Sequence, residues 1–592
     1  MSAGEVMSVF NAEGVAVHVL AGLVNGVVDD RVRLVPEPAP TGRYRLVADV
    51  DPAACDAFGV RLLVEGAARW LQLGYHSWDT SQYLPIETGG TGYALTQLAS
   101  GGGFLQLGFV RHDRLQHRFT LRESAGQRVL DVEALWDRRR PADGSSPPAS
   151  EELRVQWGAR ADDLLRDWAQ QVAVGGPRPR RGPPITGWSS WYNLYAAISA
   201  DTLRAELADL RDTDRREGWG LSVVQIDDGF TPEMGDWLTT KPQFPDGMKP
   251  LLNEIRASGY VPGLWIAPFL IGNRSELYAT HPDWAVGDRE TGRPYVCMRF
   301  YGEFRWHKRS EEYYLLDTTH PEAMAYLRRV FRTWRHEWGC GYFKTDFLYH
   351  AVEAGPERMI RHRSNLSRAE IIVAACRAIR DEIGPEATWV ACGAPFWMLV
   401  GLVDAVRIGR DAGVSWPDGM FAALSTRGFA NGILWQADPD ALLLRERFHA
   451  LAPEEQQTIA TAQAMVGGVT MTSDSVGELS QERRSLFAAA LDLTPGTCRY
   501  PILGTGDPAF VQWRPDANLL HLVNPTADPL LTRIPLSSLG LSEPPTIRRA
   551  SLTGADSPLP ETVVQQDASI VAELAPRSGV LLRVLRGSGL AQ

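Results

Sequence analysis

The sequence predicts an α/β protein in which a central (β/α)8 barrel of the TIM type lies between two antiparallel β-sandwich domains. Eight short apolar runs alternate with longer amphipathic stretches in the middle of the chain, which is the pattern of a parallel barrel. The segments on both sides alternate β-type runs with turns and lack long helical periodicity, as antiparallel domains do. A length of 592 residues is sufficient for several domains.

The predicted N-terminal β-sandwich domain covers residues 1–174. A helix-like stretch at 161–174 closes it, and residues 175–184 contain four prolines and three arginines, which favours an extended, solvated linker. The β-type runs of this domain are 16–20, 43–50, 60–64, 70–73, 104–109, 118–122 and 129–135.

The predicted barrel covers residues 185–494. Most of its apolar runs are followed by an amphipathic stretch, for example 201–211 and 321–338. The eight runs expected to form its strands are 185–191, 222–229, 261–269, 341–348, 388–395, 404–411, 432–438 and 466–473.

The last part of the chain, residues 495–592, returns to β-type runs separated by turns. These runs are 510–513, 519–523 and 579–584. We therefore predict a small C-terminal β-sandwich domain.

Composition and charge exclude several classes of protein. A net charge of −11 without a long single-sign run argues against nucleic acid as a partner. The longest apolar stretches, such as 396–403, are far shorter than the ~18 residues of a membrane span. The first thirty residues carry no lysine or arginine, so no secretory signal is indicated. Six cysteines without a CxxC pair fit a reducing compartment and offer no zinc-ribbon site, so we predict a cytoplasmic protein.

Carboxylates follow five of the eight predicted strands, at the end of the barrel where active sites lie. An aspartate in such a position can instead cap the following helix. That alternative is weaker for Asp346, because apolar residues follow it. The carboxylates at these strand ends are Asp227, Asp228, Asp346, Asp411, Asp438, Asp440 and Asp474.

Lys344 stands two residues before Asp346 on a predicted strand, so both side chains leave the same face and can meet one ligand. Only four lysines occur among 60 basic residues. We infer that position 344 requires a compact ammonium group. The alternative is a buried Lys–Asp ion pair that only holds the end of the barrel.

Aromatic side chains accompany these carboxylates and indicate a sugar ligand, whose C–H faces stack on rings while its hydroxyls bond to charged groups. Each ring taken alone fits an ordinary core. The set comprises Trp188, Trp191, Tyr192, Trp237, Trp265, Phe269, Trp397 and Trp416.

Competing chemistries lack their motifs. No lysine follows a glycine, which excludes a G-x-x-x-x-G-K phosphate loop, and the sequence has no H-E-x-x-H helix, no G-x-S-x-G elbow and no spaced His/Cys cluster. Carboxylate-driven chemistry without a metal or an organic cofactor remains.

A series of short strings resembles the α-galactosidases of glycoside hydrolase family 36. The strings run in order through the predicted barrel, and an aromatic motif of the N-terminal domain precedes them. They are GYHSW at 74–78, IDDG at 226–229, GDW at 235–237, PGLWIAPF at 262–269, YFKTDF at 342–347, CGAP at 392–395 and RIGRD at 407–411.

The resemblance implies a retaining, exo-acting enzyme that removes terminal α-D-galactosyl residues from oligosaccharides in two steps. Asp346 matches the family's nucleophile and Asp411 its general acid/base. Asp227 and Asp228 match the pair that binds the 4- and 6-hydroxyls, Lys344 the residue at the 3-hydroxyl, and Arg407 the one near the 2-hydroxyl. Further candidates for substrate binding are Trp265, Trp191, Cys392 and Trp78, the last reaching across from the N-terminal domain; the alternative for Trp78 is a place in the core of that domain.

Two electrostatic expectations follow from these roles. Lys344 beside Asp346 should favour the ionised form of that carboxylate, as a nucleophile requires. Asp411 must hold a proton, so neither Arg407 nor Arg410 is expected to contact it closely.

Other functions stay open at this stage. The family also contains α-N-acetylgalactosaminidases and galactosyl transferases, and a non-catalytic sugar-binding protein could share the barrel. The segment 298–314 is longer than the family pattern, which leaves the acceptor side and the tolerated sugar substituents undefined. The sequence does not decide whether the chain forms a homo-oligomer.

Overall fold

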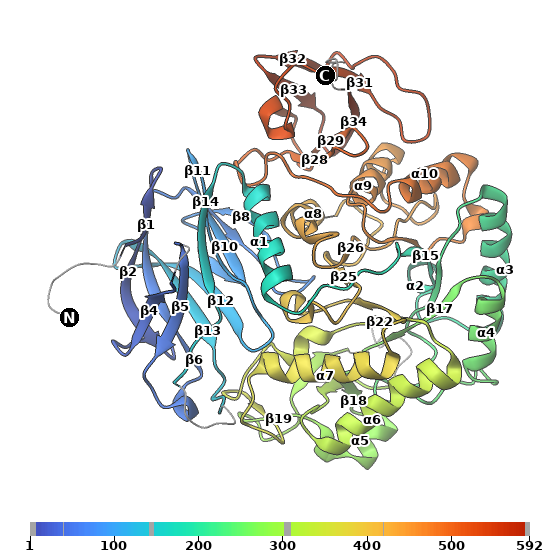
Figure 1. Ribbon diagram of the computed structural model, residues 1–592. Helices are drawn as coiled ribbons and strands as arrows, with labels where there is room; N and C mark the ends of the chain where they lie inside the picture. Colours follow the sequence, from blue (N-terminus) through green and yellow to red (C-terminus); the bar gives the residue numbers. More distant parts are fainter. Residues whose placement is uncertain (1–7, 39–40, 141–146, 301–308, 418, 586–592) are drawn as a thin grey trace.

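Two antiparallel sheets form the N-terminal part of the fold, drawn in blue in Figure 1. The computed structural model describes residues 8–38, 41–140, 147–300, 309–417 and 419–585. The first sheet has the order β1 (Ser8–Ala12), β2 (Val15–Val24), β6 (Ala57–Glu65), β13 (Gln127–Leu135), β12 (Gln116–Ser124) and β9 (Gly90–Tyr93), with β3 (Val27–Val28) paired to β2. The second has the order β4 (Val32–Pro36), β5 (Arg43–Ala48), β14 (Leu153–Gly158), β11 (Gly103–Phe109), β10 (Leu95–Ser100), β7 (Arg69–Gln72) and β8 (Gln82–Pro85).

The two sheets share one hydrophobic core. Phe58, Val60 and Leu62 alternate along β6, and Leu105 and Leu107 do the same along β11, as expected when one face of each strand is buried. The helix α1 (Ala161–Gly175) packs on the second sheet and carries Trp168, whose indole donates to the Phe109 carbonyl at 2.8 Å. The predicted N-terminal sandwich is therefore confirmed.

Eight parallel strands form a nearly closed barrel in which chain order equals spatial order. Between the two ends of this sheet, the Val469 amide donates to the Ala437 carbonyl at 2.9 Å. The predicted barrel is confirmed, and each of the eight apolar runs contains one strand. These are β15 (Thr186–Ser189), β16 (Val223–Ile226), β17 (Val261–Ile266), β22 (Tyr342–Thr345), β24 (Thr388–Ala391), β25 (Ala405–Arg407), β26 (Gln436–Asp438) and β27 (Thr470–Thr472).

Helices connect the barrel strands. Ser199 caps α3 and Ser367 caps α7, each in a capping box that satisfies backbone N–H groups of the first turn. The α-helices are α2 (Trp191–Leu194), α3 (Ala200–Glu217), α4 (Lys249–Ala257), α5 (Glu276–Thr280), α6 (Pro321–Arg332) continued by the π-helical η4 (Thr333–Trp338), α7 (Arg368–Ile383), α8 (Met420–Arg427), α9 (Pro453–Met465) and α10 (Gln481–Asp492). The shorter 3-10 turns are η1 (Pro52–Ala54), η2 (Pro282–Trp284), η5 (Leu348–Ala351), η6 (Phe396–Leu399), η7 (Gly428–Ala430) and η8 (Val476–Glu478).

The chain between β17 and α7 forms two small sheets that are separate from the barrel sheet. One has the order β18 (Leu270–Gly272), β21 (Glu312–Leu315), β20 (Val296–Arg299), and the other pairs β19 (Gly287–Asp288) with β23 (Met359–Ile360). The long segment predicted at 298–314 joins β20 to β21, and its centre, residues 301–308, lies outside the described residues.

The C-terminal part, drawn in red in Figure 1, consists of two antiparallel sheets around a separate core, as predicted. The 3-10 turn η9 (Leu536–Leu539) contributes to this core. One sheet has the order β28 (Phe510–Arg514), β29 (Leu519–Asn524), β34 (Ser578–Leu585), β31 (Thr546–Arg549), and the other the order β30 (Leu530–Pro535), β33 (Ser569–Leu574), β32 (Val563–Gln566). Domain boundaries at 174, 184 and 494 stay a prediction.

The segment 175–184 contains no strand, and its only helical residue is Gly175, the last residue of α1. Most of its residues are exposed, yet two of its arginines bind the barrel. Arg180 donates to Asp404 at 2.8 Å, and Arg181 donates to the Gly432 carbonyl. This segment is therefore anchored at the bottom of the barrel, next to the start of β25.

Asp404 is the buried carboxylate that binds this segment to the barrel. We predict that Asp404→Ala lowers the free energy of unfolding by about 3 kcal/mol. Its carboxylate accepts hydrogen bonds from Arg180, Arg380 and the Trp389 amide, each at 2.8 Å. Removing it leaves the two guanidinium groups without their counter-charge. Urea denaturation followed by tryptophan fluorescence measures the change.

The matched control for this prediction is Asp381→Ala. Asp381 pairs with Arg328 at 3.6 Å and its side chain is 58% exposed, so the expected change is below about 0.5 kcal/mol. Equal losses for the two variants would contradict the anchoring role of Asp404.

Candidate active site

Asp227 and Asp228 follow β16 directly and are each 2% exposed. The Asp227 amide donates to Ser190 Oγ at 2.9 Å, which fixes the strand end against the segment after β15. Asp227 Oδ1 accepts from the Asp228 amide at 2.9 Å, and Asp228 Oδ1 accepts from the Gly229 amide at 2.8 Å. Both carboxylates are thus oriented by backbone donors at the end of a barrel strand.

Lys344 forms its ion pair with Asp227, at 2.8 Å between Nζ and Oδ2. Burial alone would lower the pKa of the Lys344 ammonium, but Asp227, Cys392 and Asp440 together outweigh burial and raise it. The effect of Lys344 on Asp346 therefore stays a prediction. Although positions 344 and 346 share a face of β22, the long lysine side chain reaches toward the end of β16 instead.

Asp346 lies just beyond β22, where several groups fix its carboxylate. Trp265 Nε1 donates to Oδ2 at 3.3 Å, and the Phe347 amide donates to Oδ1 at 2.7 Å. Phe347 adopts a left-handed conformation with φ of 57°, which is strained for a non-glycine residue and typical of functional sites. A Cβ on Gly393 would come within 3.0 Å of Asp346 Oδ1, so the CGAP string supplies the clearance that this carboxylate needs.

The expectation that no guanidinium contacts Asp411 is wrong. Arg407 Nη2 donates to Asp411 Oδ1, and Arg407 Nη1 pairs with Asp440 Oδ2. Arg407 stands four residues before Asp411. Its guanidinium pairs with one carboxylate after β25 and with one after β26, and it therefore links the ends of these two strands. Arg410 points elsewhere and donates to the Trp78 carbonyl at 3.3 Å.

Asp411 nevertheless has the titration expected of a proton donor. Desolvation raises its pKa from 3.8 to about 6, and the charges of Asp440 and Asp346 act in the same direction, against the opposing effect of Arg407 and Lys344. The side chain remains 41% exposed, so a proton can still exchange with solvent.

Asp440 and Tyr192 also lie at this site. The sequence placed them among the strand-end carboxylates and the aromatic residues but assigned neither a role. Asp440 Oδ2 accepts from the Tyr192 hydroxyl and from the Ala412 amide, the latter at 2.6 Å. Burial raises the pKa of Asp440, but Arg407 and Lys344 outweigh burial and hold it below its ordinary value. Two features of the sequence point to these residues. Asp440 follows Pro439 at a strand end, and Tyr192 is an aromatic residue directly after Trp191.

Trp78 belongs to a segment of the N-terminal domain that contacts two barrel loops. His76 stacks on Tyr349, in the loop after Asp346, with ring centroids 4.1 Å apart. The Trp78 carbonyl binds Arg410, in the loop that carries Asp411. The N-terminal domain therefore abuts both candidate catalytic loops, while contact between the Trp78 ring and a sugar stays a prediction.

The remaining predicted residues lie around these strand ends. Cys392 is buried, and its sulfur accepts from Arg407 Nη2 at 3.4 Å. Trp265 is buried and contacts Asp346. Trp191 is half-buried on α2 and packs edge-on to Tyr195 with ring centroids 5.3 Å apart.

A cavity of about 480 Å³ adjoins the acid side of the site. Of the ten predicted site residues, only Asp411 lines it. Its other walls come from the N-terminal domain and from the loops after β25 and β26, and include Ser77, Asp79, Gln82, Arg410, Trp416, Met420, Leu443, His449 and Gln456. The cavity thus offers space next to the carboxylate that would protonate a leaving group.

Comparisons with known proteins agree with this geometry. A family model described as Melibiase matches residues 188–383. An α-galactosidase from Escherichia coli is 25% identical over 248 residues, which is 39% of this chain and 31% of the relative. The chain therefore aligns with about a third of the length of that curated relative.

Solved structures match far more of the fold. An α-galactosidase from Thermus thermophilus in complex with p-nitrophenyl α-D-galactopyranoside has a TM-score of 0.62 and 25% identity, and the match covers 82% of this chain and 94% of that one. The family 36 α-galactosidase AgaA from Geobacillus stearothermophilus has a TM-score of 0.59 and 14% identity, over 97% of this chain and 90% of that one. The chain thus contains a melibiase-family domain in the fold of the family 36 α-galactosidases and is a homologue of α-galactosidases.

Proposed function

We propose that the protein is a retaining, exo-acting α-galactosidase that hydrolyses terminal α-D-galactosyl residues of oligosaccharides by double displacement. One observation carries the proposal: two carboxylates at one end of the barrel have different environments. Asp346 is held by the Trp265 and Phe347 donors, whereas the pKa of Asp411 is raised to about 6. Pairs of carboxyl groups in different environments divide into nucleophile and proton donor in glycosidases.

In the first step, Asp346 attacks the anomeric carbon and Asp411 gives its proton to the departing glycosidic oxygen. A galactosyl ester of Asp346 results, and the leaving group departs as a neutral alcohol. In the second step, Asp411 takes a proton from water, which attacks the same carbon and releases Asp346. Two inversions give net retention of configuration.

Recognition of galactose is assigned to the buried groups at the neighbouring strand ends. Asp227, Asp228, Lys344 and Arg407 present charged hydrogen-bonding groups, and a site built this way discriminates strongly against a sugar that leaves them unpaired. The cavity beside Asp411 offers room for the rest of an oligosaccharide. The Thermus α-galactosidase has been solved in complex with stachyose, which supports a substrate of this class.

A panel of 4-nitrophenyl α-glycosides with the purified protein tests the proposal. We expect hydrolysis of the α-galactoside, weak or no hydrolysis of the α-N-acetylgalactosaminide, and α-galactose as the first product in NMR spectra recorded during the reaction. Transfer of galactose to added sucrose as the main outcome would indicate a transferase. Binding without turnover would indicate a sugar-binding protein.

The pH dependence of kcat/KM provides a second prediction. This ratio reports the free enzyme, so activity should decline as the pH rises above about 6, where Asp411 loses its proton. Asp440→Asn removes a negative charge that raises the pKa of Asp411, and it leaves Arg407 with Asp411 as its remaining carboxylate partner. Both effects lower that pKa, so the basic limb of the profile should move to lower pH.

The control for this shift is Asp474→Asn, which changes another buried strand-end carboxylate bound by the Leu444 amide at 2.6 Å. Asp474 is not among the largest influences on the pKa of Asp411. A basic limb that stays in place in Asp440→Asn, or that moves equally in both variants, contradicts the assignment of Asp411 as the titrating acid.

A further inference from the structure

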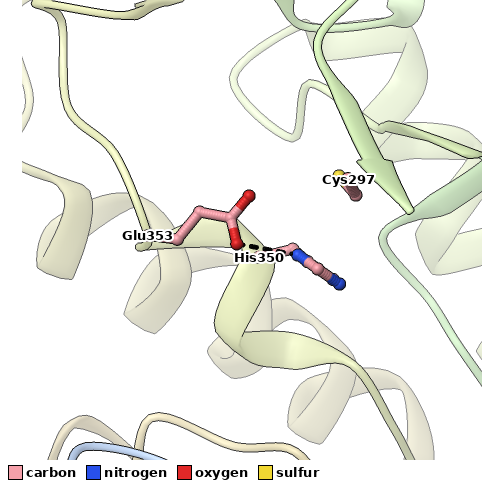
Figure 2. A group of neighbouring side chains, drawn as sticks. All are labelled: Cys297, His350 and Glu353. Carbon is pink, nitrogen blue, oxygen red and sulfur yellow. Dashed lines mark hydrogen bonds and ion pairs between the residues drawn. The ribbon is translucent and has the colours of Figure 1, made fainter. Parts of the chain in front are cut away.

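Three chemically different metal-ligating side chains meet outside the catalytic pair. Cys297 lies on β20, His350 lies on η5, and Glu353 follows η5 by two residues. One ligand atom from each lies within 4.8 Å of the others. Figure 2 shows the Glu353 carboxylate against the His350 ring, with Cys297 facing them from the neighbouring strand.

The carboxylate and the imidazole are already oriented. The Tyr295 hydroxyl donates to Glu353 Oε1 at 2.8 Å, and Glu353 Oε2 lies 2.9 Å from His350 Nδ1. Outer hydrogen bonds of this kind fix ligating side chains in metalloproteins. His350 is buried, and within the described part of the chain its Nε2 atom has no hydrogen-bond partner.

An ordinary ion pair between His350 and Glu353 would explain two of the three side chains. It does not explain the cysteine beside them, whose sulfur is the third ligand atom within 4.8 Å of the other two. An ion bound at His350 Nδ1 would take the place of the hydrogen bond between His350 and Glu353.

We propose that Cys297, His350 and Glu353 bind one Zn²⁺ ion as a structural site, with water at the fourth position. Zinc takes sulfur, nitrogen and carboxylate ligands together in a tetrahedral arrangement, whereas Mg²⁺ and Ca²⁺ prefer oxygen ligands. Binding replaces the thiol proton by the metal and releases that proton to solvent. Because binding releases a proton, uptake should strengthen as the pH rises.

The bound ion would join two segments that are far apart in the chain. Cys297 belongs to the small sheet with β18 and β21, while His350 stands four residues after Asp346. A zinc ion would therefore fix the small sheet to the loop that follows the proposed nucleophile. This proposal does not depend on the proposed function, because its tests measure metal binding.

The full-length protein, stripped with a chelator and dialysed, is titrated with Co²⁺ as a spectroscopic substitute for zinc. We expect roughly one Co²⁺ per chain, a thiolate-to-cobalt charge-transfer band, and loss of that band when Zn²⁺ is added. Mg²⁺ should not displace the cobalt. Zinc should also raise the thermal unfolding midpoint.

Variants locate the site. Cys297→Ser should abolish the charge-transfer band, Glu353→Gln should weaken Zn²⁺ binding, and Tyr295→Phe should weaken it about 10- to 100-fold through the lost outer hydrogen bond. Cys376→Ser is the control, because Cys376 is a buried cysteine and only burial shifts its thiol pKa. Absence of the band in the parent protein, or a band that survives Cys297→Ser, would overturn the proposal.

Discussion

Replacement of Asp346 by alanine is expected to lower kcat/KM for aryl α-galactosides on the order of 10⁴-fold or more, as loss of a catalytic nucleophile does in other enzymes. The effect should be the same for activated and natural substrates, because both need the covalent step. A 2-fluoro galactosyl fluoride, which slows hydrolysis of the intermediate, should label the parent enzyme and leave Asp346→Ala unlabelled. Intact-protein mass spectrometry and peptide mapping measure the label.

The control for this variant is Asp474→Ala, which removes another buried carboxylate from the same end of the barrel. It should still be labelled. A label that maps to Asp411, or a labelled Asp346→Ala protein, would reverse or refute the assignment.

Replacement of Asp411 by alanine is expected to separate the two steps. A good leaving group such as a dinitrophenolate needs little protonation, so formation of the intermediate from that substrate should be largely spared. Hydrolysis of raffinose should fall by about 10² to 10⁴-fold, because its leaving group needs the proton. Rapid-quench kinetics should then show a burst followed by slow turnover.

Azide provides the decisive measurement for Asp411→Ala. It attacks the galactosyl intermediate without a general base, so it should restore turnover of the activated substrate and give α-galactosyl azide, the product with retained configuration. The same addition should leave the parent enzyme unchanged. Equal losses of the first step on activated and natural substrates, or a β-configured azide product, would contradict the assigned role.

The fold was largely predictable because each barrel strand lies within a largely apolar run, and these runs alternate with amphipathic stretches. The strand ends were equally visible, so Asp227, Asp346 and Asp411 could be selected without the structure. The sequence could not predict which of several nearby side chains a charged residue pairs with. Lys344 shares a face with Asp346 but pairs with Asp227, because the reach of its side chain rather than the alternation along β22 decides its contact.

Tertiary packing also determines which charged groups surround Asp411, the proposed proton donor. The four-residue spacing of Arg407 and Asp411 gives no indication that Arg407 divides its charge between Asp411 and Asp440. Asp440 has a left-handed backbone, with φ of 76°, and the sequence around Pro439 did not predict which way its carboxylate would point. Cys297, His350 and Glu353 come from separate segments, so no motif spacing could predict their meeting.

The order of strands around the barrel determines when each strand can pair with its neighbours during synthesis of the chain. Thr186 on the first strand pairs with Thr470 on the last, which a ribosome adding ~5–20 residues per second reaches roughly 15 to 60 s later. One edge of β15 must remain without its final neighbour during that interval, and an unpaired strand edge can recruit another chain. Slower synthesis of the residues between these two strands should therefore prolong the exposure of this edge and lower the yield of native protein.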